Sequence, residues 1–549
     1  MRYLKSQAPP DVAASIQAIE DRADKCFESL RLITIPKDVA IWAVLTAAAG
    51  RIEAEITEHG DDTGRFSALL LNFSYLSTVA INWMRKYGRR GSTLPRVRRW
   101  NVELASSAEE ALALAHSYGV FLFNFPMWHA DRYAAELLSS TQVRFTIMDS
   151  TKGRQVNAYQ KGFRPKVGKH KGVRNKKPDV SKELNDLFSA ALESCRPKGR
   201  GMFLCPAPIE LWCALKPEYS ARMDALFRRD DSISLGSYSL GEFKAVYTAL
   251  LAISAAHEHL CFRWGQLHQE YPINSAVLVK PPYRWAQSLS DISGIPHQTC
   301  NSILKDLTLG ATRSLDLHVH PFVPFDEESK TLALLPQFPL HSRPDENILR
   351  VCSYLRPDAF NMAADTKEPE MRADLESIPS QFSIKGPGTL PKPIPNVDLI
   401  VEDVNSSTVV IGEMKWIRKP LRALERIERD ADVLKGINQL KDIKSYLRSH
   451  PNHLSLQGIL THPLDWYRHV YFLLIARDHF VWVEPEEEVA ILGFDVFSAM
   501  LGESTDLNVG TAELLRYNWL PVEGRDFVIR YERAVANGVS LESEAVFAL

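Results

Sequence analysis

Two apolar segments joined by a short polar turn constrain the fold of this chain more than any other feature, in the stretch VDLIVEDVNSSTVVIGEMKW (397–416). Runs of β-branched and other apolar residues on both sides of a turn are typical of paired strands. Asn405 and Ser406 are residue types that favour tight turns. If they form the centre of the turn, an antiparallel hairpin places Asp398 directly opposite Glu413.

The charged side chains within these strands indicate a chemical function. Glu413 and Lys415 share one face of their strand, and the same register places Asn396 opposite Lys415. Opposed side chains have Cβ atoms about 4.5–5.5 Å apart, so Asp398 and Glu413 would repel each other and lose hydration. A divalent cation removes this conflict, because Mg²⁺ is held by one or two carboxylates with water and phosphate oxygens. The residues predict a metal-dependent phosphodiesterase site, with Lys415 serving the water or the phosphate; an ion pair at a strand edge is the alternative.

The spacing of these residues resembles the D…ExK signature of the PD-(D/E)xK, or restriction-endonuclease-like, nuclease superfamily. Asp398 is followed, after fourteen intervening residues, by Glu413, Met414 and Lys415. The resemblance implies that Asp398 and Glu413 bind Mg²⁺, for which Mn²⁺ could substitute, and that Lys415 assists the attacking water. It covers roughly residues 350–500. The chain departs from the family pattern at Pro395, which two residues separate from Asp398.

The resemblance also implies two supporting residues on helices. A glutamate on the helix before the hairpin is expected to join the site; Glu370 is the first choice, and Glu368 and Glu376 are its competitors. A glutamine on the long helix after the hairpin is expected as well, and Gln439 takes this role. Gln439 is turned about 100° from the apolar Leu440 around the helix, at the edge of the buried face. A surface glutamine without function is the alternative.

The rest of the chain predicts a multidomain protein, because 549 residues exceed what one core usually organises. Residues 1–280 show mainly helical spacing. Residues 351–500 are expected to form an α/β, restriction-endonuclease-like domain with a central mixed sheet, and residues 501–549 a C-terminal extension. Further strands are expected over 381–385, 469–476, 479–484 and within 524–534.

Residues 281–350 are expected to form a separate segment that is similar to a helix-turn-helix with a wing, as in winged-helix proteins. The stretch 285–310 predicts a helix, a turn at Gly294 and a second helix, and residues 314–338 predict a hairpin. Short helix pairs are also common in helical cores, so a DNA-reading module and a structural helix pair remain open.

Two basic segments without Asp or Glu, 84–100 and 151–178, interrupt the N-terminal half. The second contains glycines and prolines, which indicate a loop. Contact with nucleic-acid phosphates and a solvated loop are both compatible with this pattern. The residues expected to contact phosphates are Lys166, Lys169, Lys171, Lys176 and Lys177.

Composition predicts a soluble cytoplasmic protein with no membrane partner. The net charge is −2, so nucleic-acid binding would depend on local patches. Seven cysteines without a CxxC pair indicate free thiols in a reducing compartment. The expected function is Mg²⁺-dependent cleavage of DNA, and the resemblance associates it with defence against foreign DNA such as that of phages. A non-catalytic nucleic-acid-binding protein on a nuclease-like scaffold and an RNA-cleaving nuclease are the alternatives; a homodimer stays open.

Overall fold

The chain folds into two compact units, each assembled from separate stretches of sequence. The computed structural model describes residues 2–59, 63–89, 100–147, 151–160, 182–194, 196–197, 203–204, 207–227, 231–269, 271–312, 316–325, 330–483 and 489–548. Unit 1 comprises Met1–Asp21, Val120–Gly172 and Ala364–Leu549, and unit 2 comprises Arg22–Gly119 and Val173–Ala363. This division differs from the predicted order of four consecutive segments, because strands from both ends of the chain pair within unit 1.

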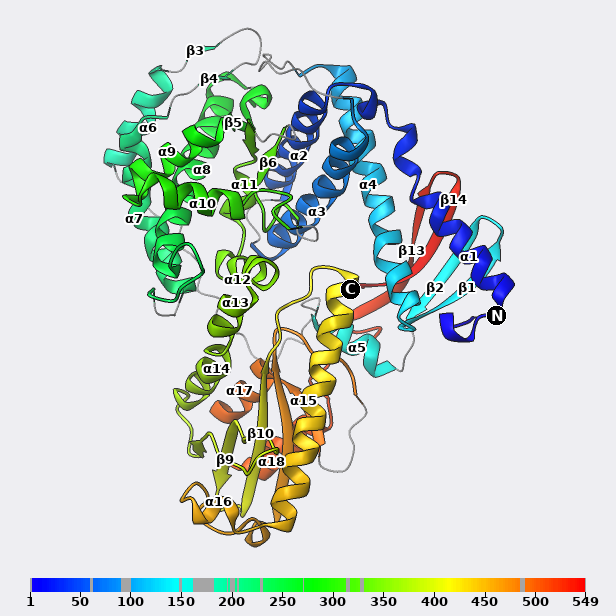
Figure 1. Cartoon of the computed structure of the whole chain (residues 1–549), viewed down its shortest axis with the longest axis vertical. Helices are drawn as coiled ribbons and strands as arrows, with labels where there is room; N and C mark the ends of the chain where they lie inside the picture. The colour runs from blue at the N-terminus through cyan, green and yellow to red at the C-terminus, as the bar shows by residue number, and fades with distance from the viewer. Residues whose placement is uncertain are drawn as a thin grey trace. The chain divides into compact units, whose positions relative to one another are not determined.

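Unit 2 is mainly helical, which agrees with the helical spacing of the N-terminal half (Figure 1). Its helices are α2 (Lys37–His59), α3 (Thr63–Tyr87), the first part of α4 (Val102–His129), α6 (Lys182–Ser194), α7 (Ile209–Leu226), α8 (Leu240–His268), α9 (Pro282–Ser293), α10 (His297–Asp306), α11 (Gln337–Leu340), α12 (Pro344–Leu355) and α13 (Pro357–Ala364). Helix α8 is long and apolar enough to cross a membrane by length and composition, but 72% of its most apolar window is buried inside the protein. It therefore packs as a core helix.

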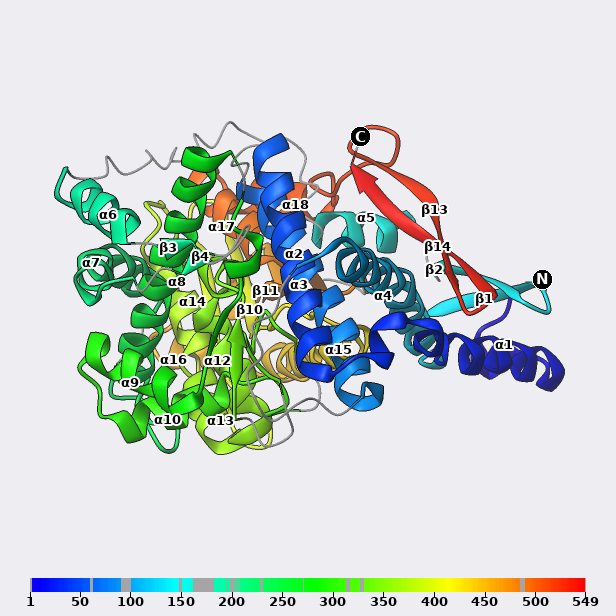
Figure 2. The ribbon, with the colours of Figure 1, turned by 90° about the horizontal axis from the view of Figure 1, so that it is seen from above.

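The predicted helix, turn, helix and hairpin are all present in unit 2. Helices α9 and α10 lie side by side (Figure 2). Gly294 ends α9 with φ of +80°, a conformation that favours glycine. The hairpin consists of β6 (Phe322–Pro324) and β7 (Leu332–Leu334), and β5 (Leu278–Lys280) pairs with β7 as a third antiparallel strand. A short pair of strands, β3 (Arg196–Pro197) and β4 (Phe203–Leu204), also belongs to this unit.

Unit 1 contains a four-stranded sheet that sequence reasoning missed in part. Its strands, in the order β1-β2-β14-β13, are β1 (Tyr133–Ser139), β2 (Gln142–Ile147), β14 (Val539–Ala548) and β13 (Phe527–Ala536). A strand was expected within 524–534, but residues 133–147 were assigned to a helical region. Strand β2 pairs in parallel with β14, so this sheet depends on contacts between residues about 400 positions apart. Helices α1 (Pro10–Ala23) and α5 (Thr151–Gln160) belong to the same unit, so the loop expected over 151–178 is wrong for its first ten residues.

The second sheet of unit 1 is a mixed, five-stranded sheet in the order β12-β11-β10-β9-β8. Its strands are β8 (Ser383–Lys385), β9 (Leu399–Asp403), β10 (Thr408–Trp416), β11 (His469–Arg477) and β12 (Val489–Gly493). Strand β9 is antiparallel to both β8 and β10, whereas β11 runs parallel to β10 and β12 runs parallel to β11. The strand predicted over 479–484 is wrong: residues 479–483 are irregular, and β12 takes the place beside β11.

Helices cover this sheet and bury its apolar residues. The predicted helix before the hairpin is α14 (Lys367–Glu376), and the predicted long helix after it is α15 (Ala423–Ser449). Both contact β10, and Figure 1 shows α15 lying along the sheet. The remaining helices are α16 (His453–Leu456), α17 (Phe494–Glu503) and α18 (Leu507–Leu515). All five residues of β9 are buried, as are the first seven of β10, so a charged side chain on these strands must be explained.

Candidate functional site

The hairpin of β9 and β10 has the predicted register. Thr408 pairs with Asp403, and the ladder continues to its last pair, Gly412 with Leu399. The carboxylate of Asp403 accepts hydrogen bonds from the backbone N–H groups of Asn405 and Ser406, at 3.0 and 3.3 Å, and so holds the turn. Local turn chemistry therefore fixes which residues come together at the open end of the hairpin.

Beyond the last pair, the backbone N–H groups of β10 donate to side-chain carboxylates instead of to carbonyl oxygens of β9. The Met414 N–H donates to Oδ2 of Asp398 at 3.0 Å. The Trp416 backbone donates in the same way to Glu368 of α14. Buried backbone donors require a partner, and these two bonds bring Asp398 and Glu368 to the strand that carries Glu413. The predicted pairing of Asn396 with Lys415 is wrong, and Asp398 lies near Glu413 without being its partner in the ladder.

A local loop explains this difference. The backbone of Val397 pairs with Gly388, and the side-chain oxygen of Asn396 accepts a hydrogen bond from the Leu390 N–H at 3.0 Å. Gly386, with φ of +147°, lets this loop approach closely, because a Cβ there would lie 2.5 Å from the Asp398 carbonyl oxygen. The loop therefore positions Asp398 at the end of β9 while Asn396 turns away.

Glu413 lies at the centre of the resulting cluster and is only 2% exposed. Its Oε1 forms an ion pair with Nζ of Lys415 at 2.7 Å. Its Oε2 is buried and has no hydrogen-bond partner among the described residues. Burial, reinforced by the Asp398 carboxylate, raises the pKa of Glu413, although Lys415 acts in the opposite direction. A simple ion pair at a strand edge leaves this second oxygen unexplained.

Lys415 is shared between two carboxylates and packs against a glycine. Its Nζ lies 3.6 Å from Oε1 of Glu368 in addition to its contact with Glu413. Burial alone would lower the pKa of Lys415, but these two carboxylates raise it. A Cβ on Gly436 of α15 would lie 3.2 Å from Cγ of Lys415 and 2.9 Å from Cδ1 of Leu474. The absence of a side chain at Gly436 therefore allows α15 to cover Lys415 closely.

The structure brings Glu368, rather than the first choice Glu370, to this cluster. Glu370 instead forms an ion pair with Lys367 at 3.2 Å and accepts a hydrogen bond from Thr366 at 3.2 Å. Glu376 lies 3.7 Å from Arg372. Burial raises the pKa of Glu368 despite its proximity to Lys415. The sequence offered three glutamates on one short helix, and only the backbone of β10 distinguishes them.

Gln439 is half-buried on α15, three residues after Gly436. Its Oε1 is buried and, like Oε2 of Glu413, has no hydrogen-bond partner among the described residues. A buried amide oxygen without a partner is costly in a purely structural position. The placement at the edge of the buried helix face agrees with the sequence expectation.

The carboxylates of this cluster suit a divalent cation that also takes ligands from water and substrate, and they do not form a complete set of protein ligands. Among the described residues, no group of three or more His, Cys, Asp or Glu side chains is arranged to hold a metal ion. Asp398 and Glu413 nevertheless could supply two hard oxygen ligands, and Oε2 of Glu413 has no hydrogen-bond partner within the described ranges. Mg²⁺ commonly takes one or two protein carboxylates and completes its shell with water and substrate oxygens.

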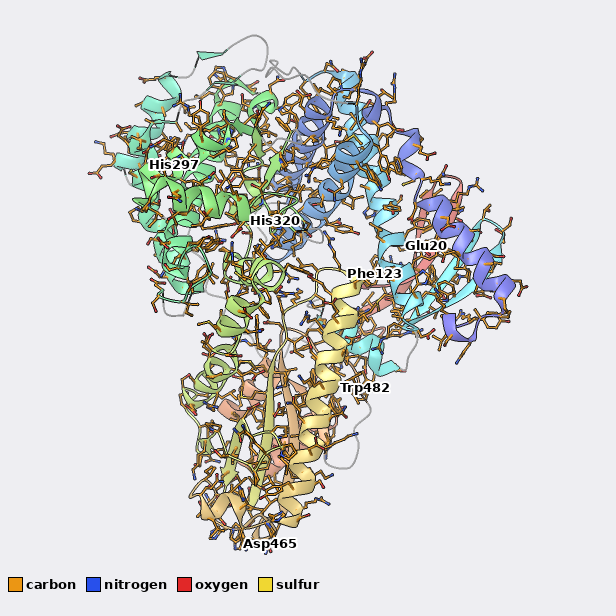
Figure 3. All side chains as sticks on the ribbon, in the orientation of Figure 1. Glu20, Phe123, His297, His320, Asp465 and Trp482 are labelled. Carbon is orange, nitrogen blue, oxygen red and sulfur yellow. The ribbon has the colours of Figure 1, made fainter. Side chains whose placement is uncertain are left out.

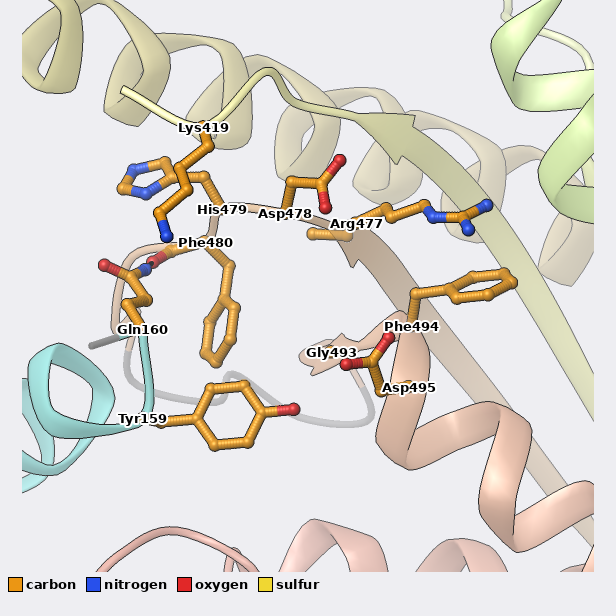
Figure 4. Close-up of a pocket in the computed structure, with 11 residues that line it drawn as sticks. Tyr159, Gln160, Lys419, Arg477, Asp478, His479, Phe480, Gly493, Phe494 and Asp495 are labelled. Carbon is orange, nitrogen blue, oxygen red and sulfur yellow. Dashed lines mark hydrogen bonds between the residues drawn. The ribbon is translucent and has the colours of Figure 1, made fainter. Parts of the chain in front are cut away.

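Unit 1 contains a cavity of about 230 Å³ that sequence reasoning missed (Figure 4). It lies beyond the carboxyl ends of β10, β11 and β12, where ligands often bind in open α/β sheets. Ala476 lines the cavity and is the register partner of Lys415. The other lining residues are Tyr159, Gln160, Lys419, Arg477, Asp478, His479, Phe480, Gly493, Phe494 and Asp495.

A buried histidine–aspartate pair supports the wall of this cavity. Nε2 of His479 lies 2.9 Å from Oδ1 of Asp430, and both side chains are almost fully buried. Arg477 pairs with Asp374 at 2.9 Å on the same side of unit 1. Asp478, with φ of +72°, turns the chain out of β11 between these two residues. The only sequence signal was the polar run Arg477-Asp478-His479 directly after an apolar strand.

The lysines expected to contact phosphates, Lys166, Lys169, Lys171, Lys176 and Lys177, lie outside the described residues. Most of the first basic segment, residues 90–99, does so as well. No family model, no curated protein and no solved structure matches this chain.

Proposed function

We propose that this protein is a Mg²⁺-dependent nuclease that hydrolyses DNA phosphodiester bonds, with Asp398 and Glu413 as metal ligands. The observation that carries the proposal is the buried Glu413 carboxylate, whose Oε2 has no partner in the described part of the chain although Lys415 and Asp398 lie beside it. Burying a charged group in this way is costly unless a bound cation compensates it.

Each residue of the cluster has a distinct role in this proposal. Bound Mg²⁺ would polarise the scissile phosphate and lower the pKa of the attacking water. Lys415, held between Glu413 and Glu368, orients this water or stabilises negative charge on the phosphate. Glu368 restrains the ammonium group of Lys415, and Gln439 donates its amide N–H to a phosphate oxygen or accepts from a water. Ala476 gives the substrate access to the cavity beside Lys415.

The scaffold supports the same proposal. Helix α14 precedes β8, β9 and β10, and α15 leads to β11, so the acid before the hairpin, the D and the ExK converge at one edge. This order matches what the PD-(D/E)xK resemblance implies, and we assign the five-stranded sheet to a restriction-endonuclease-like fold on that basis. Defence against foreign DNA belongs to the same resemblance.

Cleavage assays on several substrates test the proposal. The purified chain is incubated with supercoiled plasmid, linear duplex DNA and RNA, in Mg²⁺ or in excess chelator. The proposal predicts cleavage of DNA in Mg²⁺, none in chelator, and none by Asp398→Asn in either condition. Cleavage of RNA alone would favour the RNA nuclease. Binding of DNA by the wild type without cleavage in Mg²⁺ or Mn²⁺ would favour the non-catalytic alternative.

A further inference from the structure

The helix pair α9–α10 forms a rigid module with an outward polar face. Trp285 of α9 packs edge-on against Phe322 of β6, with ring centroids 5.1 Å apart, and its indole N–H donates to the Leu332 carbonyl oxygen of β7 at 3.2 Å. The turn between the helices is three residues long and begins at Gly294. A helix-turn-helix has this short glycine-containing turn, and its second helix enters the major groove of DNA.

Buried hydrogen bonds attach the C-terminal end of α10 to the rest of unit 2. Asp306 is 7% exposed and hydrogen-bonds to both Tyr238 and Arg356. The Asp306 carbonyl oxygen lies 2.8 Å from Nδ1 of His320. The acid of α10 therefore points inward, and no other acidic residue occurs on this helix.

The outward face of α10 carries groups that can read base edges. Gln298 and Lys305 are exposed and Asn301 is partly exposed, at the spacing of one helix face. The side chains of these three residues form no hydrogen bond or ion pair with any residue that the structure describes. Glutamine and asparagine can pair with adenine through two hydrogen bonds in the major groove, and lysine can contact guanine or a phosphate.

The start of α9 adds a phosphate-contacting corner beside the start of α10. Tyr283 is 58% exposed, and the Arg284 guanidinium lies 5.3 Å from its ring centroid. Nε2 of His297 lies 3.4 Å from the Tyr283 carbonyl oxygen, which joins the two helix starts. His297 lies at the outer edge of unit 2 in Figure 3. In a helix-turn-helix the first helix crosses the DNA backbone at this place.

We propose that α10 reads the major groove of duplex DNA, where Gln298 and Asn301 contact base edges while Arg284 and Lys305 contact phosphates. The choice of DNA as partner rests on the proposed nuclease function, but the surface is separate from the Asp398–Glu413 cluster and acts without a metal. The proposal makes unit 2 the part of the chain that selects a sequence.

Selection of duplexes from a random library by the full-length chain, in excess chelator, tests this proposal independently of cleavage. The wild type is expected to enrich one sequence and to bind it at least about 1,000-fold more tightly than a scrambled duplex. Gln298→Ala/Asn301→Ala removes two base contacts and should lose roughly 30-fold or more in affinity for the enriched site while it retains affinity for scrambled DNA. Gln266→Ala, which removes an exposed amide from α8, is the matched control and should bind as the wild type does.

The phosphate contacts give a second readout. Arg284→Ala/Lys305→Ala should weaken binding to both duplexes and reduce the slope of log affinity against log salt by about two. Circular dichroism verifies that each variant is folded. Failure to enrich a sequence, or equal affinity of wild type and Gln298→Ala/Asn301→Ala for the enriched site, overturns the proposal. Enrichment of a sequence without cleavage in Mg²⁺ would instead contradict the proposed nuclease function and still support base recognition by α10.

Discussion

Two buried glutamates on neighbouring strands should respond in opposite ways to the same isosteric change. Glu413 of β10 and Glu402 of β9 are each 2% exposed. Glu402 is fully engaged: it accepts hydrogen bonds from the Thr461 N–H at 2.9 Å, the Thr461 hydroxyl at 3.0 Å, Lys385 at 3.2 Å and the Tyr467 hydroxyl. Among the residues that the structure describes, Glu413 has a partner at one oxygen, Oε1, and none at Oε2. Glu402→Gln therefore tests structure, and Glu413→Gln tests function.

The contacts set the magnitude. In Glu402→Gln one oxygen becomes an NH₂ group that faces a donor unable to reverse, either the Thr461 N–H or Lys385, and a hydroxyl whose bond loses its charged acceptor. Losing the first bond and weakening the second should cost about 3 kcal/mol in total. In Glu413→Gln the NH₂ group can replace Oε2, which has no partner, and the neutral carbonyl still accepts from Lys415. This change also removes repulsion with Asp398, so the free energy of unfolding should stay within about 1 kcal/mol of the wild type or rise.

Thermal unfolding and cleavage rates measure the two effects. Glu402→Gln should melt roughly 6–12 °C below the wild type and, where folded, cleave DNA at the wild-type rate. Glu413→Gln should melt at or above the wild-type temperature and lose at least about 100-fold in rate, since even an outer partner of a metal ligand is worth 10- to 100-fold. A Glu413→Gln variant that is unstable but active would refute the reasoning.

The same pair predicts a pH dependence of stability. Burial alone would raise the pKa of Glu402, but its hydrogen bonds from Tyr467, Thr461 and Lys385 lower it below the ordinary value. A lowered pKa contributes stability above the unfolded-state pKa, and this contribution is lost as the pH falls through the folded-state value. As the pH falls below about 4.5, the free energy of unfolding of the wild type should therefore decrease more than that of Glu402→Gln. Equal losses in both proteins would contradict this assignment.

Three further substitutions probe the cluster. Glu368→Gln should lower the rate of cleavage by roughly tenfold because it loosens Lys415, whereas Glu370→Gln on the same helix should not; equal effects would remove Glu368 from the site. Gly436→Ala should gain up to about 1 kcal/mol of helix propensity. It should nevertheless slow cleavage by about tenfold or more, because the new methyl group displaces Lys415. An unchanged rate would show that Lys415 tolerates the shift. Gln439→Ala should slow turnover roughly 5- to 150-fold without changing metal affinity, and a wild-type rate would make Gln439 a helix-surface residue.

Local chemistry explains what could be predicted from the sequence. The Asn405–Ser406 turn and the apolar strands around it fix the register of the hairpin without help from distant residues. The same is true of the α9–α10 turn, which depends on Gly294. The candidate acids Asp398 and Glu413 follow directly from the register.

Long-range contacts explain what could not. The chain leaves β11 at Asp478 and buries His479 against Asp430, so the apolar run 479–483 does not continue as a strand. Strands β1 and β2 depend on β14, which lies about 400 residues later. Glu368 is selected over Glu370 by its contacts with Lys415 and with the backbone N–H of Trp416. None of these partners leaves a periodic signal in the sequence.

Binding of Mn²⁺ tests most directly whether Asp398 and Glu413 form a metal site, because it does not require a cleavable substrate. Electron paramagnetic resonance of the free ion during titration gives the number of ions bound and their affinity. The wild type and Glu402→Gln should each bind one Mn²⁺ that excess Mg²⁺ displaces, and Asp398→Asn and Glu413→Gln should lose this ion while they remain folded. Wild-type binding of Mn²⁺ by folded Glu413→Gln would contradict the account.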